Sequence, residues 1–263
     1  MTYAVNIVRT WEKRRKGLFF DNFLAQSCAS LAGPICGMRR IFPKKTTFIL
    51  IAGFAAASGF YIYSASSGSI VCKGVSVPTK AMPASGANFS SYCLPCIAAL
   101  RTFAREPVID SVVAAYGDVA VSHSSTKFLY GEIGLPNGGR FRPHRTHRQG
   151  LSVDLMVPLK EGEVMQTSVR NRYGYDVEFD AQGRGEQGEI DFTALSSLIV
   201  ALEKQAKMRD GKIRRIFFAP DLQPELREAS SGTLSDIRFN KRQSWVRHDD
   251  HIHVDFSFPC SVG

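Results

Sequence analysis

The sequence lacks several features that would place it in familiar protein classes. It contains no G-x-S-x-G segment and no cysteine in the context of a catalytic nucleophile, which argues against a serine or cysteine mechanism. It shows no internal repeat, and strands and helices do not alternate in units of even length. With 44% hydrophobic and 22% charged residues, the 263-residue chain is not wholly disordered, collagen-like or a multi-span membrane protein.

Most of the chain also lacks an excess of positive charge, although the net charge is +9. The first 45 residues carry nine basic and two acidic residues, or +7, whereas the remaining 218 carry 24 basic and 22 acidic residues, or +2. A nucleic-acid-binding domain concentrates basic residues on its folded part. We therefore expect no nucleic-acid partner, and a metal-dependent nuclease is disfavoured.

One uncharged segment, residues 46–64 (TTFILIAGFAAASGFYIYS), is long enough to cross a bilayer. Basic residues precede it, namely Arg39, Arg40, Lys44 and Lys45. The positive-inside rule then places the N-terminus in the cytosol and the chain after about residue 66 outside. The sequence predicts a basic N-terminal extension over residues 1–45, one apolar helix over 46–65 that is a signal peptide or an anchor, and an exported domain over 66–263.

Whether the apolar segment is cleaved stays open at this point. A basic region of 45 residues is too long for an ordinary signal peptide, whereas a start at Met38 gives one of about 28 residues. We hypothesise that Met38 is the biological start and that residues 1–37 extend the reading frame upstream, which N-terminal sequencing tests. An uncleaved segment would hold the protein at the inner membrane.

The cysteines agree with export. Four of the six follow the apolar segment: Cys72, Cys93, Cys96 and Cys260. Four cysteines in an exported domain predict two disulfides, with three connectivities open. The spacing of Cys93 and Cys96 is that of a redox pair, but no thioredoxin-like pattern surrounds it, so a structural bridge is favoured.

The exported part contains short elements in mixed order. Residues 66–92, rich in Ser, Gly, Pro and Lys, predict a linker. We expect strands over 150–157, 214–219 and 251–258, helices over 97–106 and 191–207, a partial strand pattern over 118–130, loops over 135–143 and 172–188, and a helix with a loop over 220–240. This mixture favours an α+β fold in which a small antiparallel sheet is flanked by helices and long loops.

Five of the six histidines fall in two short segments, HRTHRQGLSVD (144–154) and HDDHIH (248–253). Residues two apart in a strand share a face, so His251 and His253 project together while Ile252 faces the core. By the same alternation Asp154 lies on the polar face of its strand, and His147 comes from the loop before it. Imidazole and carboxylate ligands suit zinc, and three of them with one open position is the catalytic pattern. A single histidine is more often a surface residue, but the two clusters together predict a zinc site.

These segments resemble the penicillin-insensitive murein endopeptidases, a family of zinc peptidases related to the lysostaphin-type and D-alanyl-D-alanine carboxypeptidases. The resemblance covers about residues 69–260 and rests on GEIGLPNGGRF (131–141), HRTHRQGLSVD (144–154), RIFFAP (215–220) and WVRHDDHIHV (245–254). It implies His147, Asp154 and His253 as the three ligands of one zinc ion. It further implies His251 beside the reacting water and His144 and His248 as further active-site histidines, and a disulfide between Cys72 and Cys260.

The activity implied by the resemblance is hydrolysis of the D-alanyl–meso-diaminopimelyl cross-bridge of peptidoglycan in the periplasm. His251 is then placed to accept a proton, and His144 or His248, if protonated, to stabilise an oxyanion. Asp249 and Asp250 either orient imidazole rings or are solvated turn residues. A zinc DD-carboxypeptidase and a non-catalytic peptidoglycan-binding protein are the alternatives.

Four arginines surround the first histidine segment: Arg140, Arg142, Arg145 and Arg148. Guanidinium groups bind carboxylates through two hydrogen bonds, and peptidoglycan stem peptides carry carboxylates. We predict that Arg140 and Arg142 bind substrate, with a generally basic surface loop as the alternative.

Overall fold

The computed structural model describes residues 67–142, 144–166 and 177–260. The basic segment 1–45, the apolar segment 46–65 and the hypothesised start at Met38 lie outside these residues, so the signal peptide or anchor stays a prediction. In the part of the chain that is described, no helix combines the length and apolar character that crossing a bilayer requires.

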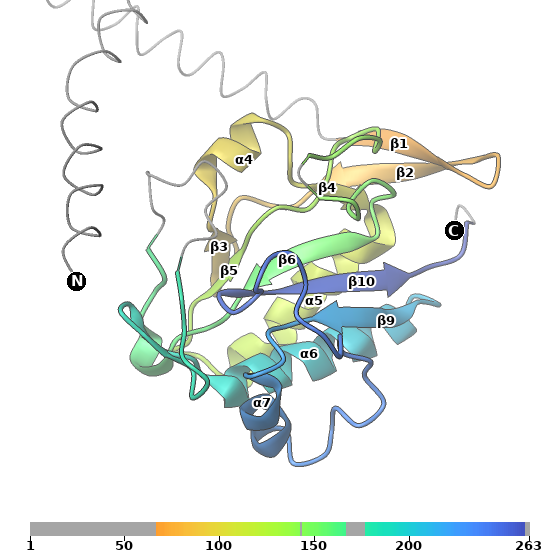
Figure 1. Ribbon diagram of the computed structural model, residues 1–263. Helices are drawn as coiled ribbons and strands as arrows, with labels where there is room; N and C mark the ends of the chain where they lie inside the picture. The colour runs from red at the N-terminus through yellow and green to blue at the C-terminus, as the bar shows by residue number, and fades with distance from the viewer. Residues whose placement is uncertain (1–66, 143, 167–176, 261–263) are drawn as a thin grey trace, which may run out of the picture. The chain divides into compact units, whose positions relative to one another are not determined.

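Five strands form the central sheet, which carries both histidine segments (Figure 1). In spatial order they are β3 (Phe89–Ser91), β5 (Phe128–Tyr130), β6 (Ser152–Met156), β10 (His251–Ser257) and β9 (Lys212–Phe217). Neighbours are antiparallel except for β3 and β5, which run parallel. A parallel pair needs a long crossover, and the chain between these two strands contains a long helix. The predicted mixture of helices and small sheets is confirmed, with this one parallel pair in addition.

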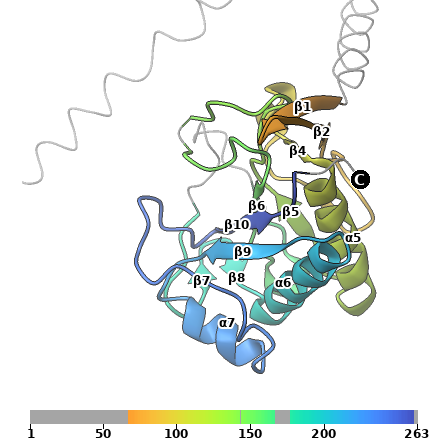
Figure 2. The ribbon, with the colours of Figure 1, turned by 90° about the vertical axis from the view of Figure 1, so that its right-hand side faces the viewer.

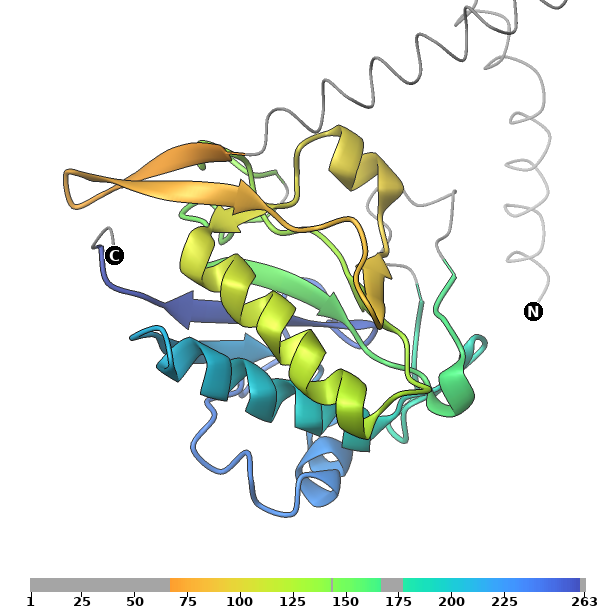
Figure 3. The same cartoon turned by 180° about the vertical axis from the view of Figure 1, so that it is seen from behind.

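Two helices, α5 (Glu106–Ser122) and α6 (Phe192–Lys207), cover one face of the sheet (Figure 3). Val153 of β6 and Val254 of β10 are completely buried in one core with the apolar sides of these helices. Because strand residues alternate between faces, His253, which lies between the buried residues Ile252 and Val254 of β10, points to the opposite side of the sheet. The core thus fixes which side chains the sheet presents away from the helices.

The loops that precede β6 and β10 lie on the side of the sheet opposite α5 and α6 (Figure 2). They comprise residues 131–151 and 230–250 and include the expected loop over 135–143. The rings of His144 and Trp245, one from each loop, lie 6.3 Å apart between centroids. The two histidine segments, about a hundred residues apart in sequence, therefore meet on this face.

A second sheet replaces the linker that composition predicts over residues 66–92. Its antiparallel strands are β1 (Ser67–Cys72), β2 (Val75–Ala81) and β4 (Phe103–Arg105), in that order. The hairpin buries few side chains, among them Ile70, Val77 and Thr79. A strand pair that buries so few side chains needs little apolar sequence, which is why composition alone misread it.

The helix expected over residues 97–106 is also wrong. The chain there forms the short helix α4 (Leu94–Ala98) and then β4. Pro107 does not end a helix but stands in the first turn of α5, where a missing N–H costs nothing. That helix continues to Ser122, so only Phe128–Tyr130 of the partial strand pattern over 118–130 is a strand.

The predicted strands over 150–157, 214–219 and 251–258 and the helix over 191–207 are confirmed with slightly different ends, while residues 172–176 of the loop expected over 172–188 lie outside the described residues. Helix α6 begins after Asp191, whose Oδ1 accepts a 2.9 Å hydrogen bond from the backbone N–H of Ala194, and its apolar stripe faces the core. Helix α7 (Gln223–Ala229) lies in the expected helix-with-loop region. Of the excursion over 172–188, the described part ends in the hairpin of β7 (Arg184–Gly185) and β8 (Gly188–Glu189), and a short 3-10 helix, η2 (Lys160–Gly162), precedes it.

Two disulfides tie the fold together. Cys72 at the end of β1 is bonded to Cys260, which follows β10, as the family resemblance implied. Cys93 and Cys96 form the second bridge, across the first turn of α4. The first bridge joins residues 188 positions apart and thereby fixes the small sheet to the C-terminal strand of the central sheet.

Candidate metal centre

Three side chains converge at the centre of the polar face: His147, Asp154 and His253. His253 Nδ1 lies 2.8 Å from Asp154 Oδ1 and 3.1 Å from His147 Nε2, and His147 Nε2 lies 3.4 Å from Asp154 Oδ1. All three are buried, with Asp154 fully enclosed. Two imidazole nitrogens and a carboxylate oxygen thus face one point, which is a donor set that could hold a metal ion.

Strand pairing and one tight turn bring these groups together. The register of β6 and β10 places Asp154 directly opposite His253. His147 lies in the preceding loop, with φ 53°, a region that non-glycine residues rarely adopt. Gly150, with φ 63°, then turns the chain into β6, and a Cβ there would come within 3.0 Å of the backbone N of Arg105. The loop therefore needs glycine at this position.

Hydrogen bonds on the remote ring nitrogens orient both imidazoles. Nδ1–H of His147 donates to the backbone carbonyl of Ile133, 2.5 Å away, which leaves Nε2 as the ligand atom. Nε2–H of His253 donates to Asp255 Oδ1 at 2.9 Å, which leaves Nδ1 facing Asp154. Fixing the tautomer in this way is what metal-ligating histidines ordinarily require.

Asp255 is itself held by two further groups. Ser152 Oγ donates to its Oδ1 at 2.7 Å, and the guanidinium of Arg215 donates to its Oδ2 at 2.7 and 3.2 Å. Burial alone raises the pKa of Asp255, but its bonds to His253, Arg215 and Ser152 outweigh burial and hold it well below its ordinary value. Asp255 is therefore a carboxylate at neutral pH and supports the ring of His253.

The charges of the three candidate ligands are strongly coupled. Burial lowers the pKa of His147 below its ordinary value, so this imidazole is neutral. Burial raises the pKa of Asp154, but the two histidines outweigh burial and hold it well below the usual range. Burial likewise lowers the pKa of His253, but Asp154 and Asp255 outweigh it and raise the value to about 9. The centre therefore favours positive charge between its carboxylates, as a cation site must.

His251 lies two residues before His253 on the same face of β10 and is equally buried. Its Nδ1–H donates to Asp250 Oδ1, 2.6 Å away. Burial lowers the pKa of His251, but Asp250 outweighs burial and raises it above the ordinary value. Of the two alternatives given by the sequence, an acid that orients an imidazole or a solvated turn residue, the first therefore applies to Asp250. Asp249 does not, because it accepts from the backbone N–H of Phe179 at 2.9 Å.

The ring of His248 lies beside that of His251, with centroids 4.7 Å apart. Its Nδ1–H donates to the backbone carbonyl of Val246 at 2.7 Å, and Ser244 Oγ lies 2.9 Å from the same nitrogen. Burial and the neighbouring histidine His251 lower the pKa of His248 to about 3. The ring is therefore neutral at neutral pH and keeps the Nε2 lone pair available.

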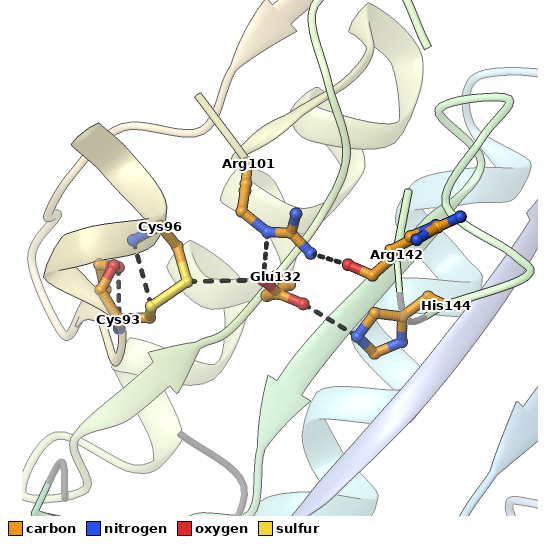
Figure 4. Close-up of a disulfide and its surroundings, with 7 residues drawn as sticks. Cys93, Cys96, Arg101, Glu132, Arg142 and His144 are labelled. Atoms are coloured by element: carbon orange, nitrogen blue, oxygen red, sulfur yellow. Dashed lines mark hydrogen bonds and ion pairs between the residues drawn. A yellow bond between two sulfur atoms is a disulfide. The ribbon is translucent and has the colours of Figure 1, made fainter. Parts of the chain in front are cut away.

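His144 is joined to a buried carboxylate, that of Glu132 (Figure 4). Its Nε2 lies 2.9 Å from Glu132 Oε2, while Glu132 Oε1 pairs with Arg101 and lies 3.8 Å from Cys96 Sγ of the short disulfide. Burial raises the pKa of Glu132, but its bonds to His144 and Arg101 outweigh burial and lower it. Ligand atoms of His144, His147 and Asp154 also lie within 4.8 Å of one another, so His144 belongs to the same centre.

The sequence model of the penicillin-insensitive murein endopeptidases matches residues 68–262 of this chain. The chain belongs to this family. Curated penicillin-insensitive murein endopeptidases from Citrobacter koseri and Salmonella paratyphi B are each 29% identical to it over 133 residues, which is 50% of this chain and 46% of the relative. The chain thus spans about half the length of the curated relatives it matches.

In this member of the murein endopeptidase family, the rings of five histidines lie close together, whereas their roles as ligands and catalytic groups stay predictions. The predicted substrate residues Arg140 and Arg142 lie on the loop at the rim and are both exposed. The backbone carbonyl of Arg142 accepts a 2.9 Å bond from Arg101 Nη2, which anchors this loop.

The sequence analysis did not identify two carboxylates that support the histidines. It did not single out Glu132, and it assigned no role to Asp255. The signal for Glu132 was available, because it is the one charged residue in the twelve-residue stretch FLYGEIGLPNGG (128–139). A lone acid in such a stretch is expected to be buried with a partner. The signal for Asp255 was its position, which alternation places on the same face as His251 and His253.

Proposed function

We propose that this protein is a zinc-dependent murein endopeptidase that hydrolyses the D-alanyl–meso-diaminopimelyl cross-bridges of peptidoglycan. The observation that carries the proposal is the convergence of His147, Asp154 and His253, each with its remote atoms already bonded. Family membership supports peptidoglycan as the substrate class.

The donor set fits zinc. Ligand atoms about 2.0–2.1 Å from a tetrahedral zinc ion lie roughly 3.3 Å from one another. The three distances between the ligand atoms here are 2.8, 3.1 and 3.4 Å, so only a few tenths of an ångström of adjustment is needed. Three protein ligands rather than four are typical of a catalytic zinc site, which keeps one position for water or substrate.

When bound, zinc supplies Lewis-acid chemistry, in that it lowers the pKa of water and polarises the scissile carbonyl. His251 takes the proton of the attacking water at Nε2, since Asp250 occupies its Nδ1. Asp250 also makes this imidazole a stronger base than an ordinary histidine. The same ring can then pass the proton to the leaving amine.

The two remaining histidines take different roles. His248 is neutral with its proton on Nδ1, so it offers a hydrogen-bond acceptor toward the site and suits orientation of a substrate N–H. His144 is proposed to contact the developing oxyanion, because its ring belongs to the same centre and its Nε2 is held 2.9 Å from Glu132 Oε2. Arg140 and Arg142 on the exposed rim are proposed to bind carboxylates of the stem peptide.

The substrate places this activity outside the cytoplasmic membrane, in the periplasm. Two disulfides within residues 67–260 agree with an oxidising compartment. Export through the apolar segment 46–65, as a cleaved signal peptide or a retained anchor, is part of the same proposal.

Digestion of purified peptidoglycan sacculi, followed by chromatography of the released muropeptides, tests this function. We expect cross-linked dimers to be converted to monomers, with activity lost on chelation, restored by zinc and abolished by His147→Ala. His123→Ala is the matched control, because this sixth histidine lies after α5 and contacts Ser197 instead. Activity that survives both chelator and His147→Ala would overturn the zinc mechanism. Release of D-alanine from monomers without loss of dimers would assign a carboxypeptidase instead.

A further inference from the structure

A cavity of about 290 Å³ lies beside the candidate metal centre, and the reaction proposed above makes no use of it. Its charged lining consists of four arginines and one acid: Arg145, Arg148, Arg214, Arg215 and Asp255. Ligand pockets for small molecules begin at roughly 300 Å³, so this volume suits a group the size of one amino-acid residue.

Among the residues that the structure describes, only part of the positive charge of this cavity is paired with an acidic group. Arg215 is paired with Asp255, the single carboxylate in the lining. Arg145, Arg148 and Arg214 are exposed and form no ion pair with any residue that the structure describes. Gathering three like charges around one hollow is unfavourable by itself and becomes favourable when an anion enters.

A β-bulge builds this arrangement into the sheet. Asp255 of β10 is opposite Arg215 of β9, but the next residue, Phe256, is opposite Ile213, so Arg214 has no partner across the ladder. In a regular strand, Arg214 and Arg215 would point to opposite faces. Here both line the same cavity, because a bulge redirects the side chain of the extra residue. Such bulges are common beside active sites.

The cavity is a neighbour of the metal centre and not a remote surface feature. His147 lines it, and Asp255, which also lines it, holds the ring of His253. Asp255 follows His253 by two residues on β10, a distance of roughly 7 Å along the strand. An anion bound here would therefore lie roughly 7 Å, or about two extended residues, from a peptide bond placed at the candidate metal centre.

We propose that this arginine-lined cavity is a second substrate subsite that binds a carboxylate of the peptidoglycan stem peptide close to the bond that is cut. The free carboxylate of the stem glutamate represents the chemical class of ligand that this subsite would bind. Arg148 and Arg214 bind it with charged hydrogen bonds, while Arg215 stays with Asp255. The inference rests on the proposed function for the identity of the ligand, but the anion site itself is independent of catalysis.

The test compares two matched cross-linked dimers that differ only in whether the stem glutamate bears a free carboxylate or a carboxamide. With the full-length wild-type protein we expect kcat/KM to be about tenfold or more higher for the carboxylate, mainly through KM. In the double variant Arg148→Gln/Arg214→Gln this preference should fall to within about twofold, with kcat little changed. Arg238→Gln, which removes the same charge from an exposed residue outside the cavity, should keep the wild-type preference.

Calorimetric binding of the uncross-linked stem peptide, in its carboxylate and amide forms, gives a readout that does not depend on hydrolysis. Equal affinity of the wild-type protein for both forms, or a preference that persists in the double variant, would overturn the subsite. Inorganic phosphate binding as tightly as the peptide would reduce it to a general anion site and overturn the peptide assignment. Absence of hydrolysis with intact, arginine-dependent binding would instead sink the proposed function and leave the subsite standing.

Discussion

Replacing Asp255 by asparagine removes a negative charge beside the candidate metal centre while keeping the hydrogen-bond geometry. The asparagine carbonyl can still accept the proton of His253 Nε2, which now donates to Asp255 Oδ1 at 2.9 Å. The hydroxyl of Ser152 can still donate to the same oxygen. What is lost is one buried negative charge, since the Asp255 side chain is only 7% exposed. Arg215 loses its partner but, at 35% exposure, can be solvated by water.

The expected loss can be worked from this arrangement. Asp154 first and Asp255 second raise the pKa of His253, to about 9, and a more basic imidazole binds a cation more tightly. Removing a hydrogen-bonded partner of a ligating histidine typically lowers metal affinity about 10- to 100-fold. This corresponds to about 1.4–2.8 kcal/mol of binding free energy. Asp255→Ala should cost more, because it removes the orientation of the ring as well as the charge.

Competition with a chromophoric chelator at pH 7.5 measures the apparent zinc Kd of each variant. Asp118→Asn is the matched control. Asp118 lies on α5, on the other side of the sheet, and is paired with Lys204 of α6. Circular dichroism verifies that each variant is folded. An Asp255→Asn protein with a zinc Kd within twofold of the wild type would refute the reasoning, as would an equal loss in the control.

Four further predictions concern the surroundings of the site. Glu132→Gln should lower kcat about tenfold. Because folding lowers the pKa of the Glu132 carboxyl, this group stabilises the wild-type protein fully above about pH 4.5, and the stabilisation is lost as the pH falls through the lowered pKa. The free energy of unfolding in urea, measured from pH 6 to 3, should therefore depend less on pH in the variant, and parallel curves for the two proteins would contradict this. Replacing Cys72 and Cys260 by serine opens a loop of 188 residues and should cost about 2–5 kcal/mol of unfolding free energy, measured by urea denaturation with and without reductant, whereas a change under 1 kcal/mol would mean that the bridge is dispensable. Gly150→Ala should destabilise the protein by about 1 kcal/mol or more and weaken zinc binding, because it strains the turn after the ligand loop; unchanged Tm and Kd would argue against a required positive φ. Arg140→Ala should raise KM more than it lowers kcat in muropeptide kinetics, and a pure loss of kcat would count against substrate binding.

The histidine site was predictable because its information is local. Alternation within HIHVDFSF and GLSVDLMV assigns each side chain to a face, and the apolar residues of each strand identify which face is buried. Alternation therefore placed Asp154 and His253 on the polar faces before any pairing of strands was known, whereas the choice of His147, Asp154 and His253 as the three candidate ligands came from the family resemblance. The hairpin of β1 and β2 was not predictable in this way, because it buries too few apolar residues to leave a periodic pattern.

The amino-acid sequence by itself indicated the family, the candidate ligand residues and the faces of their strands, since these follow from motifs shared with the family and from a period of two. Only the tertiary structure decided which groups support them. The pairing of His144 with Glu132, of His251 with Asp250 and of His253 with Asp255 depends on strand register and side-chain direction. The gathering of Arg148 and Arg214 around one cavity depends on loop packing and on a bulge that shifts the register by a single residue. The contact of His144 with Glu132 and the approach of Arg148 to Arg214 join segments apart in the chain, so no local pattern records them, whereas His251 with Asp250 and His253 with Asp255 are neighbours in sequence whose bonding depends on side-chain direction.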